Sequence, residues 1–209
     1  MITTKKELKF YIAADRVMNG LSPSSTLMEK IRGALVYDAK YKSVEYLRIL
    51  RHVEYYSKSR SVIGKVLYIY YRRLYNIAEY KYSMKIGINT CGYGLVIPHF
   101  GCIRIGTPNS IGNYAVLHFG CLIAASDSVI GNGFYMSSGA RITSKITLGD
   151  FVTVGANSVV NKSFGNNCLL AGIPAGIKRE GYRQWYERDG KTFKSRVEKV
   201  ELLRKALLD

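Results

Sequence analysis

Residues 111–160 read IGNYAVLHFGCLIAASDSVIGNGFYMSSGARITSKITLGDFVTVGANSVV, and a six-residue period runs through them. An aliphatic side chain fills every successive position of that period, with one extra residue before the fourth. These positions are Ile111, Leu117, Ile123, Ile130, Met136, Ile142, Leu148, Val154 and Val160. Glycine directly follows several of them, and glycine tolerates the tight turning of a corner. The period predicts a triangular coil of short parallel strands around a continuous aliphatic column.

The chain divides into three parts around this coil. It has 209 residues and a formal net charge of +16. Residues 1–84 hold 16 basic and 7 acidic side chains, residues 85–177 hold 5 and 2, and residues 178–209 hold 10 and 6. Between residues 43 and 82, apolar residues recur every three or four positions, which is typical of amphipathic helices. We therefore expect a basic, Tyr-rich helical region, a β-helix domain and a charged helical tail, in that order.

The excess of basic residues bears on partners and localisation. Positive charge attracts nucleic acid, membrane surfaces and phosphate-bearing ligands. Since the coil holds little of the charge, nucleic acid is not expected as a partner. A charge run on a helix is usually its solvated face. We therefore expect solvated side chains, in preference to contacts with phosphates or lipid headgroups, at Arg48, Arg51, Arg60, Arg72 and Arg73.

The sequence also predicts a cytoplasmic protein, with peripheral association at the inner face of the membrane as a further expectation. No apolar run is long enough to cross a bilayer, and the first residues lack the apolar segment of a secretory signal. Cysteines in such a chain are expected as reduced thiols.

Two further motifs flank the repeat. Residues 94–105 read GLVIPHFGCIRI, and GANSVV at 155–160 is followed by AGIPA at 171–175. With these motifs, residues 85–180 resemble the hexapeptide-repeat acyltransferases, and most of all the serine acetyltransferase branch. The resemblance implies a mainly β fold, a left-handed parallel β-helix with an N-terminal α-helical region and a C-terminal helix. It also implies a homotrimer whose active sites lie between subunits.

The chemistry that the resemblance implies is acetyl transfer from acetyl-CoA to a hydroxyl or amino group. An alcohol is a weak nucleophile at neutral pH, so it needs a base poised near pH 7, and histidine titrates in that range. His99 aligns with the family's catalytic base. His118 follows about one turn later, and it either takes part by orienting the acceptor or is a hydrogen-bonded wall residue. His52, in a Tyr- and Arg-rich helix, is expected to be structural.

The resemblance also implies which residues bind the acyl donor. In the family, backbone groups near Ser138, Gly139 and Ala156 hold the pantetheine arm of CoA. Lys162 and Lys178 are candidates for contacts with the CoA phosphates, although simple solubility explains such lysines equally well.

The acceptor is where this chain departs from the serine enzymes. They carry Asp at the positions of Met84 and Pro98, and a second active-site His in a loop that is shortened here to residues 124–128. Short, basic members of the branch resemble enzymes that O-acetylate sugars of capsular or surface polysaccharides. A glycan or its precursor is therefore the expected acceptor, and Asp127 can bind it or orient His99. Two alternatives remain open: serine acetyl transfer, and a non-catalytic scaffold that binds membrane or nucleic acid through its basic helices.

Two copies of the tetrapeptide His-Phe-Gly-Cys, at 99–102 and 118–121, raise the alternative of a zinc site. Residues three apart in an extended strand point to opposite faces, so the His and Cys of one copy converge only at a sharp turn. Cys121 also falls where the repeat places a small inward residue. We therefore expect no metal, and cysteines that belong to the core rather than act as nucleophiles.

Overall fold

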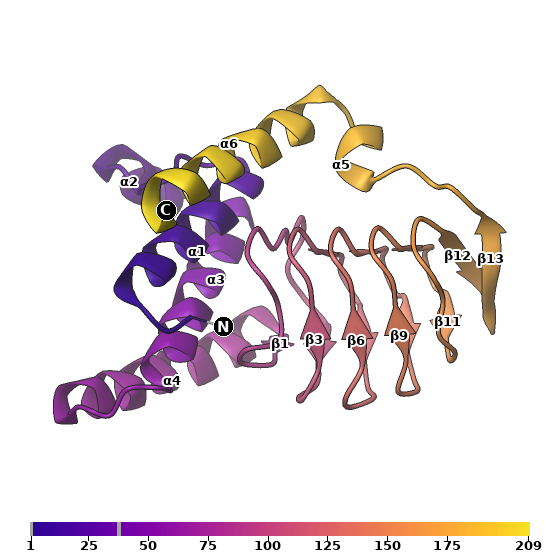
Figure 1. Ribbon diagram of the computed structural model, residues 1–209. Helices are drawn as coiled ribbons and strands as arrows, with labels where there is room; N and C mark the ends of the chain where they lie inside the picture. Colours follow the sequence, from indigo (N-terminus) through magenta and orange to yellow (C-terminus); the bar gives the residue numbers. More distant parts are fainter. Residues whose placement is uncertain (1, 37–38) are drawn as a thin grey trace.

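The middle of the chain is a left-handed parallel β-helix of about five turns. The computed structural model describes residues 2–36 and 39–209. Each turn visits three sheets, which we call A, B and C (Figure 1). Sheet A contains β1 (Met84–Ile86), β2 (Ile103–Ile105), β5 (Leu122–Ile123), β8 (Arg141–Ile142) and β11 (Val159–Val160). Sheet B contains β3 (Ser110–Ile111), β6 (Val129–Ile130) and β9 (Thr147–Leu148). Sheet C contains β4 (Val116–Leu117), β7 (Tyr135–Met136), β10 (Thr153–Val154), β12 (Leu169–Gly172) and β13 (Ala175–Arg179).

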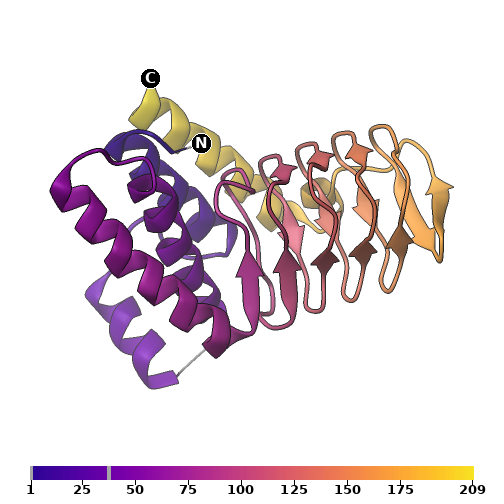
Figure 2. The same ribbon diagram turned by 90° about the horizontal axis from the view of Figure 1, so that it is seen from below.

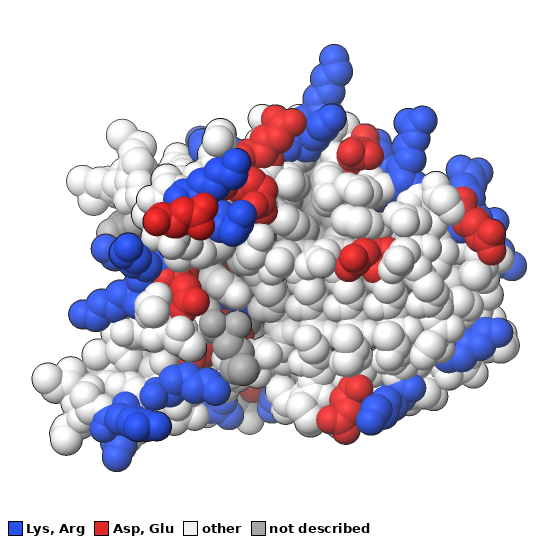
Figure 3. Space-filling model, in the orientation of Figure 1, with Lys and Arg blue, Asp and Glu red and all other residues white. Residues whose placement is uncertain are grey.

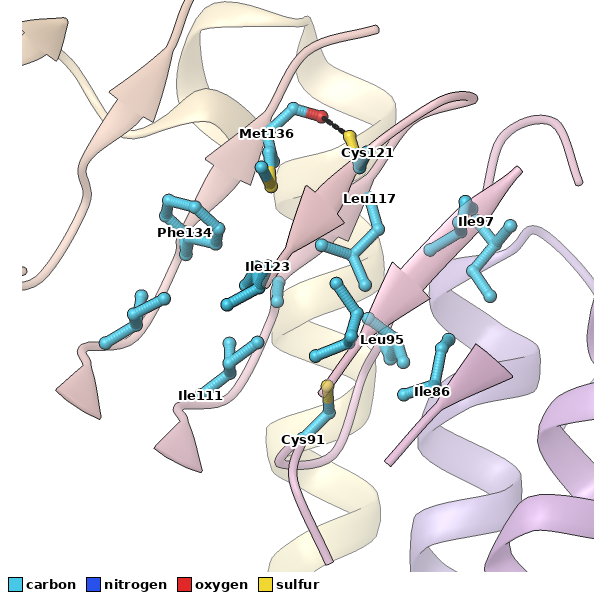
Figure 4. Close-up of a cluster of buried hydrophobic side chains, with 14 of the residues drawn as sticks. Ile86, Cys91, Leu95, Ile97, Ile111, Leu117, Cys121, Ile123, Phe134 and Met136 are labelled. Carbon is cyan, nitrogen blue, oxygen red and sulfur yellow. Dashed lines mark hydrogen bonds between the residues drawn. The ribbon is translucent and has the colours of Figure 1, made fainter. Parts of the chain in front are cut away.

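The predicted aliphatic column forms the core of this solenoid. Every position of the six-residue period is buried, with at most 2% of its surface exposed. On neighbouring turns, Ile111 pairs with Ile130 and Leu117 with Met136 in parallel register. The close-up shows labelled side chains of successive turns pointing into one interior, together with Leu95 (Figure 4). The prediction of a coil of stacked parallel strands is confirmed.

The N-terminal helices cover the first turn of the solenoid (Figures 1 and 2). The C-terminal helices run back along one side of it. The helix bounds are α1 (Lys5–Met18), α2 (Leu27–Val36), α3 (Ala39–Tyr56), α4 (Val62–Tyr82), α5 (Trp185–Arg188) and α6 (Lys191–Leu208). Helix α6 packs against α1, so the two ends of the chain lie side by side. The helical stretch expected between 43 and 82 is broken, since the Ser61 hydroxyl accepts from Gly64 N (3.0 Å) and starts a new helix. In the described part of the chain, no helix has the length and apolar character needed to cross a membrane.

Polar side chains of the helices hydrogen-bond the backbone of the first turn, where a preceding turn of the solenoid would otherwise pair with it. The outermost turn of a solenoid has backbone N–H and C=O groups with no neighbouring turn to bond them. Here Tyr46 Oη accepts from Ile86 N (2.9 Å), and Tyr75 Oη donates to Ile86 O (2.8 Å). Asn19 Nδ2 donates to Leu95 O (2.8 Å). The helices therefore close the end of the β-helix through specific hydrogen bonds as well as apolar packing.

Arg51 is the centre of this closing network and is fully buried. Its Nε donates to Asp15 (2.8 Å) and its Nη1 to Glu54 (2.9 Å), and it also donates to Cys91 O (2.8 Å) and Gly92 O (2.6 Å). Burial lowers the pKa of Arg51, but the charges of Asp15 and Glu54 outweigh burial and hold that pKa above its ordinary value. The expectation of a solvated or phosphate-facing Arg51 is wrong, because the uncovered turn leaves carbonyls that this donor-rich side chain satisfies.

Candidate active site

One column of corners gathers both candidate histidines. We call it the C–A ridge: the places where the chain passes from sheet C to sheet A, at residues 97–102, 118–121, 137–140 and 155–158. His99 lies in the first of these corners and His118 in the second, on neighbouring turns. Gly120 N donates to Gly101 O (3.3 Å), which joins the two corners directly. The structure thus brings the two histidines to one edge of the solenoid.

The corner that carries His99 is longer than the corner that carries His118. Val96 pairs with Val116 before the corner, and Arg104 pairs with Leu122 after it, so the first turn has two more residues between these pairs. This longer corner reverses through Gly101 (φ 118°) and Cys102 (φ 53°). The side chain of His99 is exposed, whereas that of His118 is half-buried.

Tyr135, from the turn that follows, holds His118. The Tyr135 Oη lies 2.8 Å from Nε2 of His118. Burial lowers the pKa of His118 and the like charge of His99 lowers it further, while Asp189 acts in the opposite direction. His118 is therefore biased toward the neutral form at neutral pH. Sequence reasoning missed Tyr135, although its distance of about one turn from His118 is a signal that could have found it.

The C-terminal segment 182–190, which we call the strap, crosses sheet C beside His118. Trp185 is buried, and its Nε1 donates to Tyr114 O (3.0 Å), which fixes α5 against the solenoid. The guanidinium carbon of Arg188 lies 5.0 Å from the centroid of the Tyr135 ring. Arg188 Nε also pairs with Asp189 (2.7 Å). The strap thus covers one side of His118, and its two charged side chains, Arg188 and Asp189, pair with each other.

Three candidates for binding the acyl donor lie on the same C–A ridge, in the turns after His118. Ser138 and Ala156 are exposed. Gly139 has φ 72°, and a Cβ at this position would lie 2.1 Å from Asn157 Oδ1. The Gly139 N–H donates to Phe119 O (3.0 Å) and Ser138 O accepts from Asn157 N (3.0 Å), so these backbone groups already bond neighbouring turns. The exposed side chains of Ser138 and Ala156 are accessible to an extended ligand such as CoA.

The other candidates lie elsewhere on the chain. Asp127 and Lys162 are exposed on corners between sheets A and B, in residues 124–128 and 161–163. Lys178 lies on β13, which pairs antiparallel with β12 and so runs back from the ridge. Because each side of the coil takes about six residues, a shift of one repeat in sequence moves a residue to a different corner. Within one chain, these three residues do not join the histidines.

The cysteines divide between the core and the surface. Cys91, Cys121 and Cys168 are buried. Burial raises the pKa of Cys121 to about 12, and its Sγ donates to Met136 O (3.4 Å; Figure 4). Cys102 is exposed, so the expectation of a core position is wrong for it, because the longer corner carries it outward. Within residues 2–36 and 39–209, no group of three or more His, Cys, Asp or Glu side chains is arranged to hold a metal ion.

Charge is distributed unevenly over the molecule. In the view of Figure 3, the side of the solenoid is largely free of charged residues, and Lys and Arg gather over the helices and the last turns. This face of the solenoid therefore presents mainly neutral groups to solvent.

Comparison with known proteins identifies the fold. Neither a scan against models of protein families nor a search of curated proteins finds a match. Among solved structures, a serine acetyltransferase from Brucella abortus strain S19 is similar, with a TM-score of 0.60 and 18% identity over 82% of this chain and 68% of that chain. A serine acetyltransferase in complex with CoA has a TM-score of 0.57 and 20% identity over 79% and 68% of the two chains. The serine acetyltransferase of Neisseria gonorrhoeae has a TM-score of 0.58 and 18% identity over 88% and 70%. At these identities, the likeness shows a shared architecture.

Proposed function

We propose that this protein is an acetyl-CoA-dependent O-acetyltransferase with His99 as its general base. The observation that carries the proposal is the C–A ridge. An exposed histidine and a half-buried histidine stand on adjacent turns there, at the head of a row of small residues. The fold is shared with serine acetyltransferases, one of them solved with CoA, which supports the choice of donor.

In the proposed reaction, His99 takes the proton of an acceptor hydroxyl as its oxygen attacks the thioester carbon of acetyl-CoA. The Gly139 N–H already donates to Phe119 O (3.0 Å), so the donor that stabilises the negative oxygen of the tetrahedral intermediate would come from Ser138. The carbon–sulfur bond then breaks, and the thiol of CoA leaves with the proton that His99 held. His118, held by the Tyr135 hydroxyl, orients the acceptor.

The proposed assembly is a homotrimer with active sites between subunits. Asp127 and Lys162 lie on the corners between sheets A and B, away from the histidines of their own chain. A neighbouring subunit that presents these corners to the C–A ridge would bring Asp127 to the acceptor and Lys162 to the CoA phosphates. Lys178, on β13 beyond the last complete turn, would approach the CoA phosphates from that end of the solenoid.

The acceptor proposed is a sugar hydroxyl of a surface glycan or of its lipid- or nucleotide-linked precursor. The C–A ridge contains no carboxylate, and Asp189 of the strap is already paired with Arg188. Met84, at a position where the serine enzymes carry Asp, is buried in the core. An amino acid brings an ammonium group that needs an acidic partner, whereas a sugar presents only hydroxyls to hydrogen-bonding groups. Within one chain the ridge therefore suits an acceptor hydroxyl without an ammonium group, and in the trimer Asp127 of a neighbouring subunit would hydrogen-bond that sugar.

Serine O-acetyl transfer is the second candidate, because the solved structures that share this architecture are serine acetyltransferases. A non-catalytic scaffold is the third. We further propose that the enzyme acts in the cytoplasm, at the inner face of the membrane, where lipid-linked glycans are accessible.

The experiment is an acetyl-transfer assay on the purified protein with acetyl-CoA. Release of CoA thiol is followed with L-serine, with sugar nucleotides and with isolated surface glycans, and mass spectrometry locates the added acetyl group. His99→Gln should abolish transfer, while His52→Gln, which removes a ring stacked on Tyr71 far from the ridge in sequence, should retain it. Faster turnover on serine than on every glycan contradicts the sugar acceptor. Unchanged transfer by His99→Gln contradicts the base, and no transfer to any acceptor favours the scaffold.

A further inference from the structure

The outer face of α4 presents an apolar stripe to solvent. Helix α4 packs on α3 and β1 through one face, where Tyr75 and Ala78 are buried. On the opposite face, apolar side chains that are more than half exposed lie along one line of the helix, which Arg73 interrupts between Ile69 and Ile77. They are Val62, Val66, Ile69, Ile77 and Tyr80. At 1.5 Å per residue the stripe is about 27 Å long. An exposed apolar surface of this extent marks an interaction surface, because removing apolar side chains from contact with water is favourable.

Basic residues accompany the stripe. Arg73 lies within it by helical spacing, and Lys65 and Arg72 lie along one edge. The single acidic residue of the α4 sequence, Glu79, pairs with Lys85 of β1 (3.3 Å). The outward face of α4 therefore combines apolar and positive groups without a competing carboxylate.

This charge pattern opposes pairing of the stripe with a second copy. Arg72 and Arg73 lie at the middle of α4 (Val62–Tyr82). Two copies packed in antiparallel register about their centres would set these arginines against each other, and a parallel register would also place like charges level. Neither arrangement offers a carboxylate to neutralise them, so like-charge repulsion opposes both.

We propose that the outer face of α4 docks the protein on an anionic phospholipid bilayer. The helix would lie in the plane of the interface. Its apolar stripe enters the headgroup boundary, and its arginines and lysine contact lipid phosphates. Tyr80 and Tyr70, both exposed on α4, are the kind of aromatic side chain that the interface favours. This docking does not depend on acetyl transfer.

The test is flotation of the full chain with vesicles of phosphatidylcholine, with and without phosphatidylglycerol. We expect binding to the anionic vesicles that weakens as salt is added. Replacing Arg72 and Arg73 by Gln should weaken that binding about 30-fold, from about one kcal/mol per cation. Replacing Lys191 and Lys194 by Gln, two exposed cations of α6, removes the same charge and should leave most of the binding.

A second pair of variants tests the apolar stripe. Val66→Gln, Ile69→Gln and Ile77→Gln together should weaken vesicle binding by at least about tenfold. The matched control replaces the same number of exposed apolar residues outside α4 by Gln. These are Val129, Ile177 and Leu202.

Three outcomes would overturn the proposal. The first is absence of vesicle binding by the wild-type chain. The second is equal loss of binding in the α4 variants and their controls. The third is a change in molecular mass by light scattering, without lipid, in the stripe variant alone, which would assign the face to contacts between copies of the chain. Circular dichroism verifies that each variant is folded.

Discussion

Replacing Arg51 by Met should lower the stability of the protein far more than the position of Arg51 on a basic helix suggests. The substitution keeps much of the apolar length of the side chain and removes every donor. It leaves the carboxylates of Asp15 and Glu54 without their cation, and the carbonyls of Cys91 and Gly92 without a donor. Water cannot easily take the place of the lost guanidinium group, because Arg51 is fully buried.

The magnitude follows from those lost partners. Removing one partner of a buried ion pair costs about 3 to 5 kcal/mol, because the remaining charge stays buried without compensation. For a chain of this size, each kcal/mol lowers the melting temperature by about 2 to 4 °C. The melting temperature of Arg51→Met should therefore fall by about 6 to 20 °C, and Asp15→Asn in the same chain should add less than its separate effect.

The assay is thermal and denaturant unfolding followed by circular dichroism, at fixed protein concentration because assembly also contributes to stability. Arg48→Met is the matched control, since Arg48 is exposed one turn earlier on α3 and should change stability by no more than about 0.5 kcal/mol. Equal effects of the two substitutions, or a loss below about 1 kcal/mol for Arg51→Met, would refute the view that the arginine closes the solenoid.

The site yields further predictions. Nuclear magnetic resonance titration of the imidazoles should show a pKa of His118 below the ordinary range, raised by His99→Gln and lowered further by Asp189→Asn; shifts of the opposite sign would contradict the arrangement. Because folded His118 binds its proton less tightly than the unfolded chain does, its contribution to stability is present at high pH and is lost as pH falls through its unfolded pKa toward the lower folded one, which pH-dependent unfolding measures. Gly139→Ala should lower stability by about 1 to 2 kcal/mol and raise the KM for acetyl-CoA, since it places a side chain at positive φ against the next turn. Gly165→Ala, with nothing near its Cβ, should do neither.

The coil could be predicted from the sequence because its cause is local and repeated. Each aliphatic residue of the six-residue period must face inward for the column to be continuous, so one pattern determines the sheets and the strand register. Ile111, Leu117 and Ile123 show the rule on three successive sides. The closing network could not be predicted in the same way. It joins Asp15 on α1 and Arg51 on α3 to the first turn, and only the tertiary fold determines that these polar residues meet.

Part of the candidate site shares the local character of the coil. His99 and His118 lie about one turn apart, and the structure sets them on one ridge because the longer first corner leaves both in the same passage from sheet C to sheet A. Asp189 comes to His118 for another reason, since the tail doubles back over sheet C and Trp185 fastens it there. No period in the sequence encodes that return, so the strap was outside what pattern could predict.

The geometry separates residues that maintain the fold from those free to acquire function. Substitution at an inward position such as Leu117 disturbs several turns, because the column is continuous, whereas the corners change length without loss of the column, as the two extra residues beside His99 show. The tail couples the two ends of the molecule. Trp185 rests on the solenoid, and α6 packs on α1, whose Asp15 accepts from Leu95 N (2.9 Å) in the first turn. If the helical cover loosens, the surroundings of His118 should therefore change through the strap as well as through the first turn.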